Sequence, residues 1–126
     1  MLLKTILVIL LTITLSTTGA MANNTKQLNT IAGKQQVLSK KIVKAYGKNN
    51  KSVDIMTTIK ALEAGQLKLK KIAVCNSEID NLFLFLTICL DEMKVLIKKP
   101  YSAENAQLVA DLSASISEGS YYIAKA

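Results

Sequence analysis

Several residue types are absent from this chain of 126 residues, and each absence excludes a class of function. Histidine is missing, so neither a Ser-His-Asp triad nor a histidine-containing metal site can form. Arginine is missing too, because all sixteen basic residues are lysines. No guanidinium fork can therefore grip an anion, and any anion site must use ammonium groups, amides, hydroxyls or backbone N–H groups.

The usual arrangements of catalytic groups are also missing. No glycine-rich phosphate loop is present, and the neighbouring acids Asp91 and Glu92 would point apart on a helix. Glu78 and Asp80 are better explained as acids in the first turn of a helix. We therefore expect a protein that is not an enzyme and that uses no cofactor.

The two cysteines, Cys75 and Cys89, are too few for a metal site. In a hairpin that turns near residues 76–77, they are offset by about 12 Å along the helix axes. A disulfide needs Cα atoms within about 7 Å, so an internal bridge requires the segment before the turn to fold back. Buried free thiols and a bridge between subunits remain the alternatives.

The first 22 residues have the pattern of a secretory signal peptide. Lys4 supplies the positive charge, residues 6–15 form a short apolar run, and Ala20-Met21-Ala22 is an A-x-A cleavage site. The apolar run is shorter than the ~20 residues that span a bilayer. We expect cleavage after Ala22, no stable membrane insertion afterwards, and a periplasmic or secreted domain of residues 23–126.

With one proline and half of its residues apolar, that domain is expected to be helical and packed. Apolar residues spaced three or four apart predict helices near 25–46, 55–73, 78–99 and from Ser102 onward. The core rows are Leu28, Ile31, Gln35, Leu38, Ile42 and Ala45, then Ile55, Ile59, Leu62, Gln66, Leu69 and Ala73, and finally Val109, Leu112, Ile116, Gly119 and Ile123. Short turns between the helices predict an all-α fold, an antiparallel up-down-up-down four-helix bundle.

The third expected helix contains LFLFLTICL at residues 82–90, which is apolar on nearly every face. Such a helix is either central or covered by a second subunit. The fourth expected helix is rich in alanine, serine and glycine. Together these features are compatible with a homodimer.

The first expected helix carries a family-like motif, LNTIAGKQQVLSKK at residues 28–41. This run resembles the opening helix of the PilJ-type domain, which is the N-terminal domain of type IV pili methyl-accepting chemotaxis transducers. A related box occurs in nitrate/nitrite sensor kinases. The family reads asparagine, one or two apolar residues, Ala-Gly, a basic residue, then Gln, Arg, Met, Leu, Ser, Gln and Arg. The direct matches are Ala32, Gly33, Gln35, Leu38 and Ser39, while Lys34 and Lys41 keep the basic character.

The resemblance implies a sensory domain that binds a small ligand and serves chemotaxis or signal transduction. Two departures qualify what it implies. Gln36 stands where the family has the arginine that binds the anion in nitrate/nitrite sensors, so nitrate recognition by the same means is not expected. Family members usually continue into a transmembrane helix and a signalling domain, whereas this sequence stops at Ala126, so we expect a free-standing sensory domain.

Two interpretations of the polar residues in the core rows stay open. Gln35 and Gln66 lie at similar heights in the first hairpin, where they could hydrogen-bond each other, because buried amides need partners. Alternatively, a small ligand site between helices would consist of Gly33, Gln35, Gln36, Ser39 and Gln66.

Charge is distributed unevenly along the chain. Residues 23–76 hold eleven lysines and two acids, for a charge of +9, and residues 77–126 hold four lysines and seven acids, for −3. The basic hairpin is either an ordinary solvated surface or a docking surface for an anionic ligand, anionic lipid or acidic protein. Its docking lysines would be Lys34, Lys44, Lys48, Lys51 and Lys68. Export and few aromatic residues argue against nucleic acid.

Three hypotheses for function follow. The first is an exported, non-enzymatic sensory domain that binds a small ligand. The second is a periplasmic structural or interaction protein that docks on an acidic or receptor protein partner and takes no small ligand. The third is a remnant of a receptor that has kept no binding role.

Overall fold

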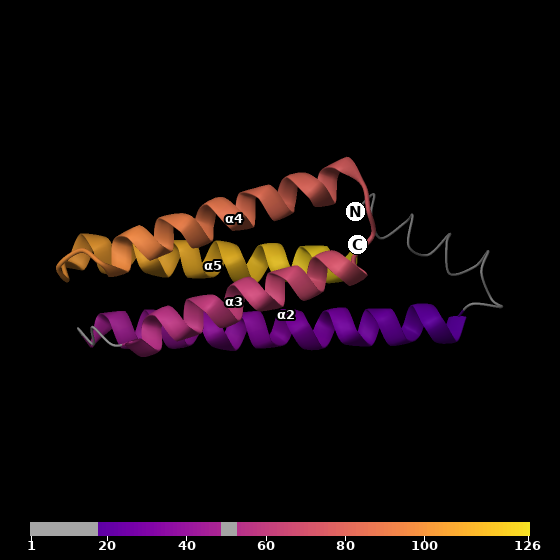
Figure 1. Ribbon diagram of the computed structural model, residues 1–126, viewed down its shortest axis with the longest axis horizontal. Coiled ribbons are helices and arrows are strands. Elements are labelled where there is room, and N and C mark those ends of the chain that lie inside the picture. The colour runs from indigo at the N-terminus through magenta and orange to yellow at the C-terminus, as the bar shows by residue number, and fades with distance from the viewer. Residues whose placement is uncertain (1–17, 49–52) are drawn as a thin grey trace.

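The computed structural model of the protein describes residues 18–48 and 53–126, and the side chains of residues 24–48 and 55–126. These residues form four α-helices and no strand: α2 (Thr18–Gly47), α3 (Val53–Ile72), α4 (Ser77–Ile97) and α5 (Ala103–Lys125). The expected all-α class and the four-helix bundle are confirmed. Figure 1 shows α2 and α5 along the length of the molecule, with α3 and α4 inclined to them.

The helices follow one another around the bundle in the order α3, α2, α5, α4. Where two neighbouring helices meet, which we call a seam, residue numbers in successive contacting pairs rise along one helix and fall along the other. Neighbouring helices are therefore antiparallel. Helix α2 meets α5 at Gln36–Tyr121 and meets the residues just before α5 at Tyr46–Tyr101. The pairs between α3 and α4 are Gln66–Thr87 and Glu63–Lys94, and those between α4 and α5 are Leu86–Gly119 and Glu78–Tyr122. Between α2 and α3, Gln35 contacts Leu62, and Ile31 shares a shallow pocket with Ile72.

Side-chain caps fix the first turns of α4 and α5, the two helices that follow short connections. Asn76 Oδ1 accepts a hydrogen bond of 2.9 Å from the backbone N–H of Ile79, and Ser102 Oγ accepts one of 3.0 Å from Asn105. Each bond satisfies an N–H that has no partner within the helix. The two caps stand directly before the first residues of α4 and α5, Ser77 and Ala103.

The core is formed by one buried row from each helix. The rows of α3 and α5 match the expected ones closely, although Gln66 and Leu112 are only half-buried. The row of α2 differs from the prediction, because Ile31, Leu38 and Ala45 are half-buried while three other residues of α2 face inward. These three are Ala32, Ser39 and Tyr46, at 0%, 0% and 4% exposure.

The inward rotation of α2 follows from a close contact with α3. Gln35 is 2% exposed, and its Nε2 donates a hydrogen bond of 2.8 Å to the backbone carbonyl of Leu62. Its amide lies directly over Gly65, where an added Cβ would stand 2.7 Å from the Gln35 Cδ. Ser39 Oγ donates 2.7 Å to the carbonyl of Gln35 one turn earlier. The polar residues that interrupt the row of α2 therefore bind this helix to α3. We call the contact of Gln35 and Ser39 with Leu62 and Gly65 the α2–α3 joint.

The predicted signal segment falls almost wholly outside the described residues, which begin at Thr18. Helix α2 passes through the predicted cleavage site, so cleavage after Ala22 would shorten it at its start. Within the described part of the chain, no helix combines the length and apolarity needed to cross a membrane.

Two glycines in helix interiors make a matched test of the joint. Gly65→Ala would push a methyl group into the Gln35 amide, and overpacking of this kind costs about 1–3 kcal/mol. Gly33→Ala would meet only Tyr121 Oη at 3.9 Å, an ordinary contact, so its better helix propensity should stabilise the fold by about 1 kcal/mol. Urea unfolding monitored by circular dichroism measures both changes.

The same experiment has an internal check. In a Gln35→Ala background the methyl group added by Gly65→Ala has room, so the loss of stability that it causes should shrink well below its value in the wild type. Equal losses in both backgrounds would contradict the joint between Gln35 and Gly65.

Candidate functional site

The five residues predicted to bind a ligand do not gather at one place. Gln35 and Ser39 are buried in the core and satisfied by the contacts at the α2–α3 joint. Neither side chain lines the α3–α4 cleft, the pocket between α4 and α5 or the pocket between α2 and α3. A ligand could reach them only by opening the bundle, so the interruption in α2 serves packing.

Gly33 and Gln36 lie at a different seam, between α2 and α5. Tyr121 Oη donates a hydrogen bond of 3.1 Å to Gln36 Oε1 and passes 3.9 Å from the position of a Cβ on Gly33. Gln36, which replaces the arginine of the related motif, therefore joins two helices that are 85 residues apart in sequence.

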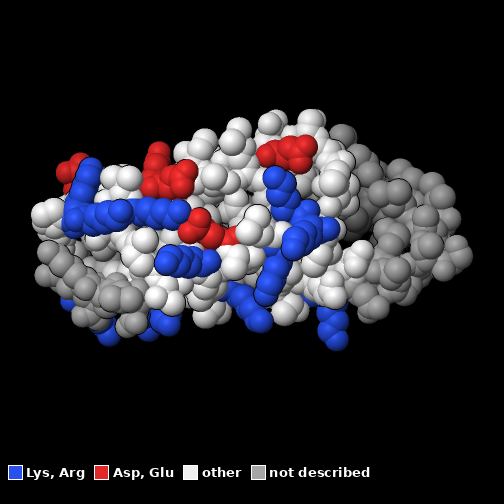
Figure 2. All heavy atoms as spheres, in the orientation of Figure 1, with Lys and Arg blue, Asp and Glu red and all other residues white. Residues whose placement is uncertain are grey.

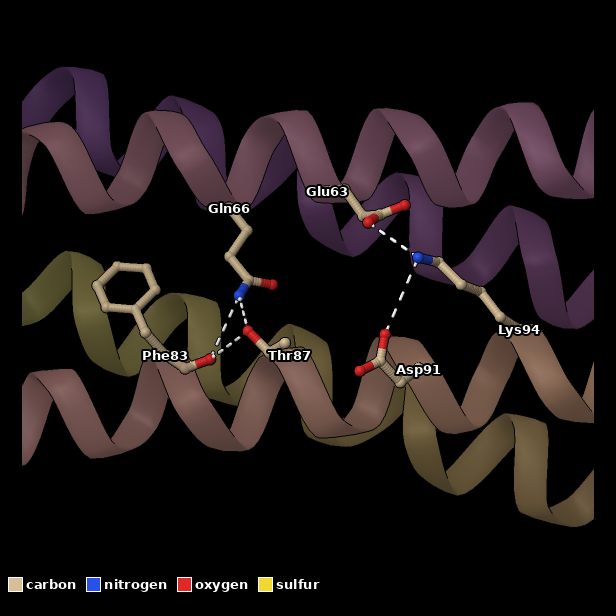
Figure 3. A network of polar contacts seen from close by, with 6 residues as sticks. All are labelled: Glu63, Gln66, Phe83, Thr87, Asp91 and Lys94. Carbon is tan, nitrogen blue, oxygen red and sulfur yellow. Dashed lines mark hydrogen bonds and ion pairs between the residues drawn. The ribbon is translucent and has the colours of Figure 1, made fainter.

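Gln66 faces away from Gln35, toward α4. The hypothesis that the two glutamines bond each other is wrong, because each amide has another partner. Gln66 Nε2 donates 2.9 Å to Thr87 Oγ1 and 3.3 Å to the carbonyl of Phe83, and Thr87 Oγ1 itself donates 2.9 Å to that carbonyl. Figure 3 shows the three groups closing a small ring of hydrogen bonds between α3 and α4.

An ion-pair cluster lies next to this ring in the same seam. Lys94 Nζ, from α4, donates 3.0 Å to Glu63 Oε2 on α3 and lies 3.9 Å from Asp91 Oδ1, one turn earlier on α4 (Figure 3). These charged side chains are 30–68% exposed, so solvent screens the pairs and their contribution to stability is small. Their consequence is mainly local, since they hold charge at the rim of a cleft.

The α3–α4 cleft has two connected parts that share Gln66, Leu67 and Thr87. One part, of about 180 Å³, adds Glu63, Leu90 and Asp91. The other, of about 500 Å³, adds Lys70, Asp80, Phe83 and Leu84. Of the four seams in the bundle, α3–α4 is the least extensively packed. The cleft thus combines an amide, a hydroxyl and charges of both signs at the seam where the helices are held together least.

Sequence reasoning found only Gln66 among the groups of this cleft. It missed Glu63, Thr87, Asp91 and Lys94. The sequence does contain a signal, namely the spacing of polar residues. Gln66 and Glu63 on α3 are three residues apart, and Thr87, Asp91 and Lys94 on α4 are four and three residues apart. Residues three or four apart share one face of a helix, so these steps place a polar face on each of the two helices.

The predicted docking lysines are exposed where the structure describes them. Lys34, Lys44 and Lys48 project from α2 or its end and Lys68 from α3, while Lys51 lies outside the described residues. In Figure 2 the lower edge, along α2, shows lysine side chains and no acidic ones, and the acidic side chains gather higher. Among the described residues, Lys94 is the one lysine with a carboxylate within 4.0 Å. The lysines of α2 and α3 are thus a solvated, uncompensated surface.

The cysteines are both free thiols, so the internal disulfide is not formed. Cys75 is exposed in the α3–α4 connection, and Cys89 is 3% exposed on α4. Burial, and secondly the charge of Glu92, raises the pKa of the Cys89 thiol above its usual value. A raised pKa keeps this thiol protonated and poorly reactive. No group of three or more acidic or cysteine side chains among the described residues is placed to hold a metal ion.

Comparison of this chain with protein-family models, with curated proteins and with solved structures found no match. The resemblance to the PilJ-type domain stays a prediction from the motif in α2 and from the number and spacing of the helices.

The two thiols should differ strongly in reactivity. We expect iodoacetamide at pH 8 to modify Cys75 quickly in the folded protein, because that thiol is exposed. Cys89 should react only after unfolding, or slowly as the pH rises, since burial and its raised pKa both suppress the thiolate. Mass spectrometry of tryptic peptides over time measures each site. Rapid labelling of Cys89 in the native protein, or no labelling of Cys75, would contradict this arrangement.

Proposed function

We propose that this protein is a non-enzymatic binding module of the sensory type, exported to the periplasm or beyond and accessory to chemotaxis or another signalling process. Its ligand is a small polar molecule, and its ligand site is the α3–α4 cleft. The observation that carries the proposal is the cleft itself, where Gln66 and Thr87 lie beside paired charges at the loosest seam.

The free acceptors in the cleft indicate the chemistry of the ligand. Both N–H groups of Gln66 point to α4, so its amide oxygen receives none of the hydrogen bonds drawn in Figure 3. Glu63 and Asp91 each use one oxygen toward Lys94 and keep the other. Lys94 compensates one of the two carboxylate charges, so three acceptors and a net negative charge remain, which suit a ligand ammonium group. With Lys70 available in the adjoining part, a small amine or amino acid fits best.

The size of the smaller part of the α3–α4 cleft agrees with a small ligand. The smaller part of the cleft measures about 180 Å³ and is open on one side, so it can take a ligand of a few heavy atoms. A ligand bridging α3 and α4 would favour one spacing of these helices over another, and a difference in affinity between two spacings is what shifts a population.

Thermal unfolding of the purified protein against amines, amino acids, organic acids and small anions tests this function. A ligand at a hundred times its Kd adds about 2.7 kcal/mol, which shifts Tm by roughly ten degrees in a domain of about this size. Amines or amino acids should give the shift. Gln66→Leu and Asp91→Asn should abolish it, whereas Gln36→Leu, the same change at the α2–α5 seam, should keep it. A panel without any shift, or a shift lost only in Gln36→Leu, would count against the cleft.

The second candidate function is docking on an acidic protein partner through the exposed lysines of α2 and α3. It is favoured by one observation, namely that these lysines have no carboxylate partner within 4.0 Å among the described residues. Attraction between such a surface and an acidic partner is long-ranged and is screened by salt over about 8–10 Å.

Two triple variants with equal loss of charge test the docking surface. Binding to a polyglutamate probe should weaken steeply with salt, and Lys34, Lys44 and Lys48→Gln should lower the affinity and flatten the salt dependence. Lys98, Lys99 and Lys125→Gln removes three charges from the other hairpin and should change binding much less. Equal losses in both variants would mean that net charge alone attracts the probe, and the docking surface would be rejected.

A further inference from the structure

The outward face of α4 and α5 exposes a contiguous apolar surface. Phe85, Ile88 and Val95 on α4 are 45%, 49% and 57% exposed, and Leu108 on α5 is 43% exposed. These four side chains line one groove of about 470 Å³ between the two helices, together with the half-buried Leu112. We call this surface the α4–α5 groove.

Four exposed apolar side chains gather at this surface, whereas two, Leu67 and Leu84, lie together at the polar α3–α4 cleft. Val37 on α2 is 66% exposed but lines no described pocket, and single exposed residues of this kind are common on soluble proteins. The largest contiguous apolar patch on a soluble protein is often a functional surface. Helix α4 was expected to be central or covered; it is peripheral, so its outer face lacks a cover within the described part of the chain.

The distribution of charge selects which surface can meet a second copy. The α2–α3 hairpin carries most of the positive charge, and two copies that met through it would repel each other. The α4–α5 groove lies on the opposite hairpin, which is mildly acidic, and its rim holds Glu92 and Asp111 beside Lys99. A rim with positive and negative side chains can pair with the same rim of a second copy across a two-fold axis. The lysine surfaces of both copies then face outward.

From these observations we propose that the α4–α5 groove is the interface of a two-fold homodimer. A two-fold pairing places the same patch on both copies, so the apolar side chains cover one another and no open chain of subunits results. This inference is independent of the ligand site, because the groove lies on the side of α4 next to α5 and the cleft on the side next to α3.

The available area is sufficient for a reversible dimer. Helix α4 has 21 residues and is about 30 Å long, and two adjacent helices are roughly 20 Å wide, which gives a face of about 600 Å² in projection. Corrugation raises the accessible area toward the ~800 Å² per partner of a standard interface. A face of this size lies at the small end of specific interfaces, where pairs are weak and transient, so we expect a dimer that dissociates at micromolar concentrations.

Sedimentation of the purified protein from about 1 μM to about 1 mM, a range that brackets such a Kd, tests the proposal. The wild type should pass from monomer to dimer over this range. Val95→Glu should remain monomeric at the top of the range with unchanged helix content. Val37→Glu is the matched control, because the same substitution is made at a similarly exposed valine on the opposite hairpin, and it should dimerise normally.

A second variant, Ile88→Lys, brings the opposite charge to the same groove and should also prevent dimerisation, so the result does not depend on one substitution. A wild type that stays monomeric up to about 1 mM would overturn the proposal. So would a dimer that survives both groove variants, or one that only Val37→Glu disrupts.

Discussion

The close contact of Gln35 with the backbone of α3 is the constraint on which the rest of the bundle depends. A buried amide is costly unless it is hydrogen-bonded, and Gln35 finds its partner in the carbonyl of Leu62 only because Gly65 has no side chain. That contact fixes the rotation of α2 and its register against α3. With these set, the lysines of α2 lie in solvent, and Gln66, next to Gly65, points toward α4.

Most of the fold could be predicted because periodicity is a local property of the sequence. Three- and four-residue spacing gave the helices, and the rows of α3 and α5 identified their buried faces. The face of α2 was predicted slightly wrongly because apolarity was used as the guide. Ser39 is buried, since its hydroxyl bonds the carbonyl one turn back, and Ile31 remains half-buried. A polar residue satisfied by its own backbone behaves in the core as a small apolar one.

The polar groups of the cleft could not be predicted in the same way, because each bond depends on the rotation of two helices. Counting from the turn placed Gln35 and Gln66 at one height, but height does not determine which neighbour an amide faces. The contact of Gln36 with Tyr121 joins the first helix to the last and has no local signal. Family resemblance drew attention to α2, where the motif turned out to serve packing, whereas the polar cleft lies on α3 and α4.

Helix α4 contributes to both the cleft and the apolar groove, and consecutive residues of α4 belong to the two surfaces in turn. Thr87 bonds Gln66 on the side next to α3, and Ile88 lines the groove on the side next to α5. Asp91 and Glu92 repeat this alternation one turn later. A small rotation or shift of α4 must therefore alter both surfaces together. If a ligand in the cleft favours one position of α4, it changes the free energy of dimerisation by its difference in affinity for the two positions. Linkage makes the effect reciprocal, so dimerisation changes ligand affinity by the same factor. The proposed sensory role thereby acquires a physical output, which is the association state of the bundle.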